Sequence, residues 1–425
     1  MQKRYVFVLL AASLILSFTG QAFSENWPQF RGNTGQGLST EKSLPGTWSE
    51  TENVLWKTPI PGAGWSSPVV WEDRIFLTSA SGEKGTTCYV LCVDAKSGQI
   101  LWDKEVFTQV VQRKEDRNSC ATPTPATDGK NVYAVFCDGS VVALDFQGNV
   151  VWTNRDFKSY SYHGIGASPI LWEGLLIMPY DVSSGEKDKA LGWMKPWDQA
   201  FILALDTNTG QVRWKAKRGL SRIAHSAPCV WTDPKNGSVQ LISSAGDVAQ
   251  GFDLKTGERL WSSRNEGYSA VPSPAVGDGL VFTANGYGGR ESTKAFRLGG
   301  KGDLQETNLA WEQKQGTPKV PSFLYVAPYL YSVDDNGLAT CFKGATGEIV
   351  WQERLGGTFS ASPVLVDGKV YFLSDKGETT VVAVEPQFKV GSKSVLDGKC
   401  QASIAASNGR LFIRTEKSLY CIGSK

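Results

Sequence analysis

A repeat of apolar runs, tight turns and tryptophans dominates the chain from residue 53 onward. Each copy has a short apolar run, a polar turn that ends in glycine, and a strand-like segment with tryptophan four residues after that glycine. Well-formed copies are VLCVDAKSGQILWDKE (90–105), ILALDTNTGQVRWKAK (202–217), QGFDLKTGERLWSSR (250–264) and ATCFKGATGEIVWQER (339–354). Short apolar runs bounded by turn residues predict β-strands, so the pattern predicts pairs of strands joined by tight turns.

The repeated tryptophans set the size of the unit, because successive copies lie 40 to 62 residues apart. The register is Trp56, Trp102, Trp152, Trp214, Trp261, Trp311 and Trp351. A second landmark, usually Ser-Pro, begins each unit at positions 67, 124, 168, 227, 273, 322, 362 and 403. Four short strands fit in each unit. Eight units predict an all-β fold, a single eight-bladed β-propeller of four-stranded antiparallel blades.

The last unit begins near Ser403 and has room for only three strands before Lys425. The isolated segment NVLWKTP (53–59) supplies the missing outer strand. We expect the ring to close by pairing of this N-terminal strand with the C-terminal blade, because pairing removes two free sheet edges. Each outer-strand tryptophan is expected to fill the wedge between neighbouring blades, which widens away from the axis.

The first residues predict export. Lys3 and Arg4 precede an apolar run from 6 to 18, and Ala22-Phe23-Ser24 offers small residues at a cleavage point. This pattern is typical of a secretory signal peptide over residues 1–24. We therefore expect a strap over 25–52, a propeller over 53–425, and a periplasmic or secreted protein without a transmembrane anchor once the signal is removed.

The strap contains the glycine-rich run NWPQFRGNTGQG (26–37), which raises the question of a phosphate-binding loop. Such a loop needs a strand before the glycines and a helix after them. Here polar residues and then Pro45-Gly46 follow. The run is therefore interpreted as a segment that Trp27 and Phe30 pin to the propeller, while its glycines allow it to bend.

Charge and histidine content exclude several function classes. With 44 Lys and Arg against 42 Asp and Glu, the chain gives no electrostatic reason to expect a nucleic-acid partner. Separately, we expect the protein to be a monomer. His163 and His225 are the only histidines, so a three-histidine metal site is impossible. Turns such as Asp94 to Gly98 place Lys96 where calcium would need an oxygen ligand, so we interpret them as structural turns.

Eight cysteines in an exported protein raise the question of disulfides. Cys88 and Cys92 lie four residues apart on one predicted strand, about 13 Å, which is too far for a bridge. Cys92 shares with Cys341 and Cys421 a position that small core residues fill in other units. Cys120 and Cys400 precede the innermost strands of units 2 and 8, where both a reactive and a paired state stay open.

The units resemble the PQQ-type (quinoprotein) propeller repeat, small-x-Asp-x-x-Thr-Gly-x-x-x-Trp. The segments that carry the resemblance are Cys92-Val93-Asp94 to Trp102, Ala204-Leu205-Asp206 to Trp214 and Gly251-Phe252-Asp253 to Trp261. The WPQFRGN opening is similar to that of exported proteins with this propeller. The resemblance implies one of two functional classes, calcium- and PQQ-dependent dehydrogenases or non-catalytic scaffolds such as the BamB-type component of the outer-membrane protein assembly machinery.

The connections that enter the innermost strands of a propeller all emerge on one axial face. Two residues before each landmark lie Trp65, Thr122, Gly166, His225, Val271, Val320, Ser360 and Gln401, which we expect to ring the channel mouth. A quinoprotein dehydrogenase needs carboxylates there, to hold Ca²⁺ and to accept a proton, and this ring has none. The predicted ligand-binding residues are Trp65, Thr122, His225, Ser360, Gln401 and the basic neighbour Arg222. For His225 a purely structural role stays open.

Three insertions (106–120, 181–200 and 284–293) are expected on the same face. The second carries Trp193, Met194 and Trp197, which are predicted to bind a partner or, alternatively, to fold over the channel and seal it. The predicted function is a non-enzymatic scaffold, without metal or cofactor, for an envelope protein, a peptide or a small ligand. One alternative is a dehydrogenase with PQQ and calcium held by Asp181, Glu186 or Asp198. The other is a BamB-like assembly factor.

Overall fold

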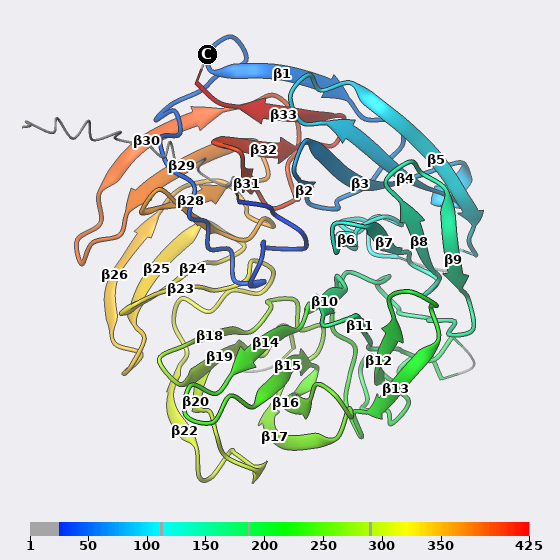
Figure 1. Ribbon diagram of the computed structural model, residues 1–425. Helices are drawn as coiled ribbons and strands as arrows, with labels where there is room; N and C mark the ends of the chain where they lie inside the picture. The colour runs from blue at the N-terminus through cyan, green and yellow to red at the C-terminus, as the bar shows by residue number, and fades with distance from the viewer. Residues whose placement is uncertain (1–24, 111–113, 186–187, 289–290, 425) are drawn as a thin grey trace, which may run out of the picture.

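Eight four-stranded antiparallel sheets form a closed ring in the computed structural model, which describes residues 25–110, 114–185, 188–288 and 291–424 (Figure 1). This confirms the predicted eight-bladed propeller. The predicted signal peptide, residues 1–24, lies outside the described residues. Within the described part of the chain, no helix combines the length and the apolar character that crossing a membrane requires.

The blades are numbered in chain order. In each blade the first strand named lies nearest the axis and the fourth lies at the outer edge. Blade 1 holds β2 (Val69–Trp71), β3 (Arg74–Ser81), β4 (Thr87–Asp94) and β5 (Ile100–Thr108), with the 3₁₀ turn η1 (Glu83–Gly85); blade 2 holds β6 (Ala126–Thr127), β7 (Asn131–Val135), β8 (Val141–Asp145) and β9 (Val150–Asn154); blade 3 holds β10 (Ile170–Trp172), β11 (Leu175–Tyr180), β12 (Phe201–Asp206) and β13 (Val212–Lys217); blade 4 holds β14 (Cys229–Thr232), β15 (Val239–Ala245), β16 (Asp247–Asp253) and β17 (Arg259–Asn265), with β21 (Gly302–Asp303) parallel to its edge.

The second half of the ring continues in the same order. Blade 5 holds β18 (Ala275–Gly277), β19 (Leu280–Ala284), β20 (Thr293–Arg297) and β22 (Leu309–Gln313); blade 6 holds β23 (Leu324–Val326), β24 (Tyr329–Val333), β25 (Leu338–Lys343) and β26 (Ile349–Arg354); blade 7 holds β27 (Val364–Val366), β28 (Lys369–Leu373), β29 (Glu378–Ala383) and β30 (Val390–Val395); blade 8 holds β31 (Ala405–Ser407), β32 (Arg410–Arg414), β33 (Ser418–Ile422) and β1 (Val54–Pro59).

The ring closes where the sequence predicts. Strand β1 pairs antiparallel with β33, so that Trp56 lies opposite Cys421 and Pro59 opposite Ser418. The N-terminal strand is thus the outer strand of the C-terminal blade, and Figure 1 shows β1 and β33 side by side. This pairing confirms the predicted closure.

Five of the seven repeated tryptophans join one blade to the next, whereas Trp261 donates to Gln240 Oε1 of its own blade. Trp56 of blade 8 donates its indole N–H to the carbonyl of Ala95, in the turn between β4 and β5 of blade 1, at 3.1 Å. Gly98 of that turn has φ 75°, and a Cβ built on it would meet the Trp56 ring at 2.6 Å. The same indole-to-carbonyl bond recurs from Trp102 to Phe146, Trp152 to Thr207, Trp214 to Leu254 and Trp311 to Gly344. The glycine turn and the tryptophan are therefore two sides of one contact between blades.

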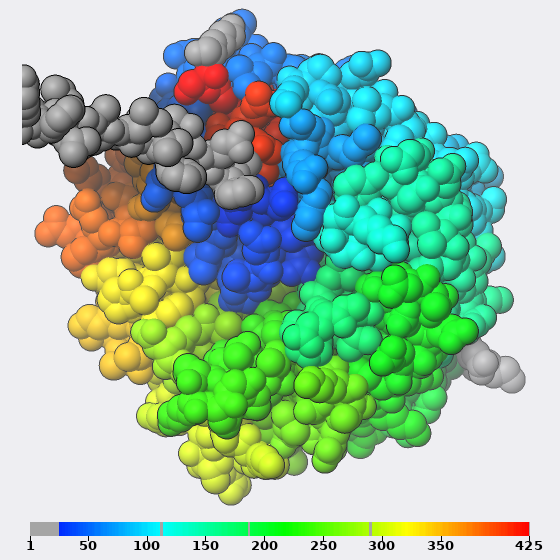
Figure 2. Space-filling model, in the orientation of Figure 1, coloured from blue at the N-terminus to red at the C-terminus, as the bar shows by residue number. Residues whose placement is uncertain are grey.

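The strap crosses the centre of the ring on the face where the innermost strands end. Figure 2 shows the blue N-terminal residues filling the centre on this face. The contacts are Glu25 O with Ser407 Oγ, Trp27 with Val70, Pro28 O with Thr127 N, Gln29 Oε1 with Leu171 N, Gln36 with Cys229 and with Val276 N, Arg31 Nη2 with Phe323 O, and Gly37 O with Leu365 N. One short segment therefore touches all eight blades.

Two strap side chains anchor this arrangement. Trp27 is fully buried, and its backbone exchanges two hydrogen bonds of 2.8 Å with Val70 of β2. Arg31 is also fully buried, and its Nη2 donates to the carbonyls of Gln36 at 2.8 Å and Phe323 at 2.5 Å. Burial lowers the pKa of the Arg31 guanidinium to about 10, which leaves it charged at neutral pH. The strap is thus a packed part of the structure.

We predict that Trp27→Ala lowers the free energy of unfolding by about 3–5 kcal/mol, because it removes a fully buried indole from the centre of the ring. Urea unfolding measures the change. Lys42→Ala is the control in the same segment, since its side chain is 70% exposed and lies 3.9 Å from Asp367. Equal stability of both variants would contradict the role given to the strap.

Gly98→Ala tests the contact between blades. We expect it to destabilise the protein by about 2 kcal/mol more than Gly237→Ala, because overpacking against the indole adds to the backbone strain that both changes share. Gly237 is a matched control, since it has φ 73°, donates to the carbonyl of Asp233 as Gly98 does to Asp94, and has open space where a Cβ would lie. Thermal unfolding of the two variants gives the comparison, and equal losses would exclude the indole contact as the cause.

Candidate functional site

A cavity of about 400 Å³ lies on the propeller axis, at the end of the channel opposite the strap. All eight residues that were expected to ring the channel mouth belong to its lining, which are Trp65, Thr122, Gly166, His225, Val271, Val320, Ser360 and Gln401. Phe30 of the strap also reaches the lining. The strap therefore closes one end of the channel, and a ligand would enter from the other face.

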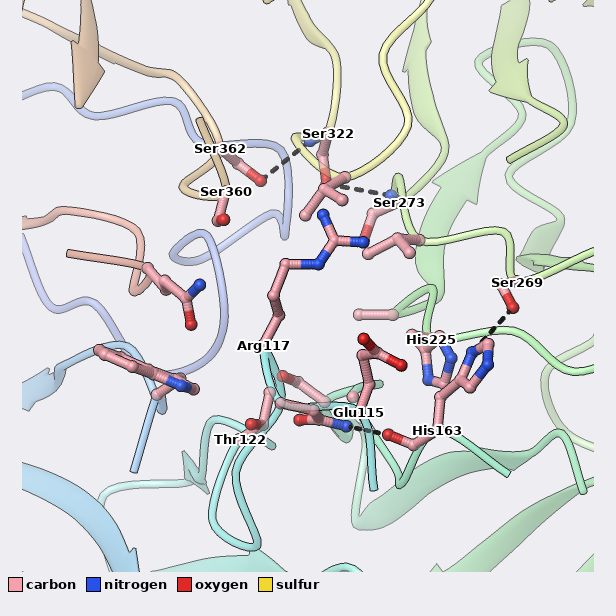
Figure 3. A pocket seen from close by; sticks show the side chains of 18 of the residues that line it. Glu115, Arg117, Thr122, His163, His225, Ser269, Ser273, Ser322, Ser360 and Ser362 are labelled. Atoms are coloured by element: carbon pink, nitrogen blue, oxygen red, sulfur yellow. Dashed lines mark hydrogen bonds between the residues drawn. The ribbon is translucent and has the colours of Figure 1, made fainter. Parts of the chain in front are cut away.

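A ring of hydroxyl groups forms the next layer of the cavity wall, and it consists of the landmark residues themselves. In six of the blades the backbone N–H of the landmark donates to the hydroxyl of the landmark in the next blade, as Ser322 does to Ser362 at 3.0 Å (Figure 3). The other bonds of this kind run from Ser67 to Thr124, Thr124 to Ser168, Ser273 to Ser322, Ser362 to Ser403 and Ser403 to Ser67. Blade 4 has Ala227 at this position, which interrupts the ring. This layer of the wall is neutral.

The two histidines face each other beside the cavity. The rings of His163 and His225 lie 6.1 Å apart and nearly parallel, and Figure 3 shows them next to Ser269, which contacts His163 Nδ1 at 3.2 Å. Both ring nitrogens of His225 are shielded from water and have no hydrogen-bond partner among the described residues. Burial, together with the neighbouring His163, lowers the pKa of His225 to about 3. His225 is therefore neutral at pH 7.

Of the aromatic and apolar residues in the insertion of blade 3, one lines the cavity and two do not. Trp193 lines the cavity and stacks on Tyr162, with ring centroids 3.8 Å apart. Met194 is 49% exposed, and the backbone of Trp197 pairs with Ser221 away from the lining. Of the three residues expected to bind a partner, Trp193 is thus placed to meet a cavity ligand, whereas Met194 and Trp197, on the same insertion, are not among the lining residues.

The sequence did not single out Glu115, Arg117 and Asn118, which the first insertion contributes to the lining. Figure 3 shows Arg117 extending into the cavity. Its guanidinium lies 3.3 Å from the Tyr287 hydroxyl and 3.9 Å from the Asp335 carboxylate, and its side chain is still 58% exposed. The signal in the sequence that could have indicated them was the insertion itself, because its residues do not belong to the repeat.

Several residues named from the sequence do not reach the cavity lining. Arg222 forms a two-pronged ion pair with Asp247, at 2.5 and 2.7 Å. Asp181 is buried against Arg218, with which it makes an ion pair at 2.5 Å. Asp198 is exposed on the outer loop, and Glu186 lies outside the described residues. Arg222, Asp181 and Asp198 therefore have structural or solvent-facing positions.

The lining was tested for its fit to calcium with PQQ. Calcium takes six to eight oxygen ligands, several of them usually carboxylates. Among the described lining residues Glu115 is the one carboxylate, and the side-chain oxygen of Asn118 accepts from Ser119 N at 2.9 Å. No group of three His, Cys, Asp or Glu side chains in the described residues could hold a metal ion. These donors do not fit a calcium–quinone centre, so no dehydrogenase step is derived from them.

Comparison with known proteins gives the family. A family model described as outer membrane protein assembly factor BamB matches residues 46–159, 197–301 and 302–387, more than half of the chain. A polyvinylalcohol dehydrogenase from Pseudomonas sp is 25% identical over 242 residues, which cover 49% of this chain and 35% of that protein. BamB from Yersinia pestis is 25% identical over 272 residues, which cover 60% of this chain and 62% of that protein. The chain therefore spans less than two thirds of either relative.

Among solved structures, a europium-containing methanol dehydrogenase superposes with a TM-score of 0.63 and 12% identity, over 93% of this chain and 90% of that one. At this level of identity the likeness shows the fold alone. The sequence relatives and the structural neighbour thus carry names from both functional classes that the repeat implies.

The neutral state of His225 predicts a pH dependence. The pKa of about 3 in the folded protein lies below the ordinary value of about 6.5, so between these values the unfolded chain binds more protons and stability falls as the pH falls. From pH 7 to pH 5 this costs about 1–2 kcal/mol. Urea unfolding at both pH values should show that His225→Gln loses less stability than the unaltered protein. An equal loss would show that the pKa of His225 is not lowered in the folded protein.

Proposed function

Since the chain belongs to the family of the outer membrane protein assembly factor BamB, whose members are PQQ-type propellers, we propose that it is an exported, non-enzymatic binding scaffold. The axial cavity is its binding site. The observation that carries this proposal is that the strap closes the channel at one end, so that the cavity is a blind pocket with contributions from all eight blades.

The cavity suits a small ligand, or the tip of a peptide that a partner inserts. Its volume of about 400 Å³ falls within the range of small-ligand pockets. Trp65, Trp193 and Tyr268 supply aromatic surface, the landmark hydroxyls supply neutral polar groups, and Arg117 supplies a positive charge. This mixture of apolar walls with a few polar groups binds and orients a ligand, and Arg117 is the group that would meet an anionic part of it, with Glu115 as the one carboxylate of the described lining.

A larger partner would also meet the rim of the same face. Met194 is 49% exposed and Leu220 is 69% exposed, and the Trp197–Ser221 pairing joins the two segments that carry them. Exposed apolar side chains around a blind pocket are typical of a surface that a peptide or protein can cover. This arrangement supports the partner-binding role proposed for Trp193, Met194 and Trp197.

Two other functions follow from the relatives. The match to a polyvinylalcohol dehydrogenase favours a PQQ- and calcium-dependent dehydrogenase, and the donor set of the cavity weighs against it. The matches to BamB favour a role in outer-membrane protein assembly. In that case the ligand is a protein segment, and the rim contributes more to binding than the cavity does.

Ser360→Trp, which fills the cavity, and Met194→Ala, which changes only the rim, separate these functions. In a thermal-shift screen of carboxylate-bearing small molecules and short peptides, we expect ligands at about 100 times their Kd to raise Tm by several degrees. Ser360→Trp should abolish the shift and Met194→Ala should keep it. Loss with Met194→Ala alone would favour the rim and a protein partner.

An activity measurement addresses the dehydrogenase directly. The unaltered protein with added PQQ and Ca²⁺ should not reduce an electron-accepting dye in the presence of alcohols, polyvinyl alcohol or sugars. Dye reduction that depends on both PQQ and alcohol would contradict the non-enzymatic role.

A further inference from the structure

Three cysteines meet between blades 1 and 2, where the first insertion ends. Cys88 lies on β4, Cys120 ends the insertion, and Cys137 lies in the turn between β7 and β8. Cys88 and Cys120 belong to one buried cluster, and Cys137 packs against it. These residues lie 17 to 49 positions apart in the sequence, so the fold alone brings them together.

The side chain of Gln109 shows how closely Cys120 and Cys137 approach. Its Oε1 accepts from the Cys137 Sγ at 3.2 Å, and its Nε2 contacts the Cys120 carbonyl at 3.5 Å. Cys120 Sγ donates to the carbonyl of Lys84 at 3.2 Å, and the thiols of Cys120 and Cys137 also interact with each other. The two sulfur atoms are therefore neighbours within one hydrogen-bonded group.

The two thiols differ in reactivity. The interaction with the Cys137 thiol lowers the pKa of Cys120 below its ordinary value, whereas the interaction with Cys120 and burial raise the pKa of Cys137. Burial also raises the pKa of Cys88, which is fully enclosed. Cys137 is partly exposed and Cys120 is 3% exposed. An oxidant would therefore reach Cys137 first, and Cys120 is the sulfur that forms a thiolate more readily.

We propose that Cys120 and Cys137 are a redox-active pair that closes to a disulfide in an oxidising compartment. The oxidant is a small or protein disulfide, and it is reduced to two thiols. One of the two cysteines first attacks it as a thiolate, which forms a mixed disulfide and releases one thiolate. The thiolate of the other cysteine then attacks the protein sulfur of the mixed disulfide, which forms the Cys120–Cys137 bond and releases the second thiolate. The two thiol protons of the cysteines end on the two released thiolates.

The bond would fasten the insertion that supplies cavity residues. Cys120 lies two residues after Asn118 and three after Arg117, and Ser119 between them donates from its backbone to Thr122 Oγ1 at 3.0 Å. Oxidation would fix the end of this segment to the β7–β8 turn of blade 2, and reduction would release it. The pair therefore couples the redox state of the compartment to one wall of the cavity.

The test uses the full chain and oxidised glutathione as the oxidant. The reduced protein is incubated with oxidised glutathione, unfolded, alkylated without reductant, digested and mapped by mass spectrometry. We expect six alkylated cysteines and one cross-linked peptide pair that joins Cys120 to Cys137. Eight alkylated or glutathionylated cysteines without a cross-link, or a bond between Cys88 and Cys120, would overturn the proposal.

A second measurement does not depend on mapping. Oxidation should raise the Tm of the unaltered protein by a few degrees, because the bond constrains the unfolded chain. Cys120→Ser and Cys137→Ser should lose this redox-dependent shift. Cys400→Ser is the matched control, because Cys400 is also buried and precedes the innermost strand of blade 8, and it should keep the shift. A shift that survives in Cys137→Ser would contradict the assignment.

Discussion

The contact between a tryptophan and the glycine turn of the next blade, which five of the seven repeated tryptophans make, is the interaction on which the rest of the structure depends. A four-stranded blade has two faces to bury, and only its neighbours can cover them. Five of the tryptophans donate their indole N–H to a carbonyl in the following blade's turn, and Trp56 does so across the chain termini. The Trp56 contact forms only if the N-terminal strand β1 pairs with the C-terminal blade. Closure of the ring is therefore needed to complete the contacts that stabilise it.

Closure has a consequence for function, because a closed ring leaves a channel on its axis. The strap fills one end of that channel with Trp27 and Arg31, and it contacts the innermost strand region of every blade. The opposite end stays hollow and is lined by the residues that enter the innermost strands. The glycine-rich run that raised the question of a phosphate-binding loop is thus the floor of a cavity. Its Phe30 contributes to the lining directly.

The sequence predicted the features that repeat, and it predicted poorly those that do not. The tryptophan register and the Ser-Pro landmarks predicted the blade count, the closure by β1 and the ring from Trp65 to Gln401. They could do so because equivalent residues of each repeat occupy equivalent positions in each blade. Arg117 and Glu115 stand in an insertion that was expected on the axial face, but it has no register, so the sequence did not indicate which of its residues point inward. Arg222 was named for its charge, but Asp247, which pairs with it, became visible only when the fold brought the two together.

The most direct test of a non-enzymatic binding site in the axial cavity is a crystal structure of the protein purified from its own source without added ligands. The account predicts electron density for a bound small molecule or peptide end between Arg117, Trp193 and the histidine pair, with the strap in place beneath it. Density for a quinone with a coordinated calcium ion in the cavity would contradict the account, and so would a ligand bound on the strap face.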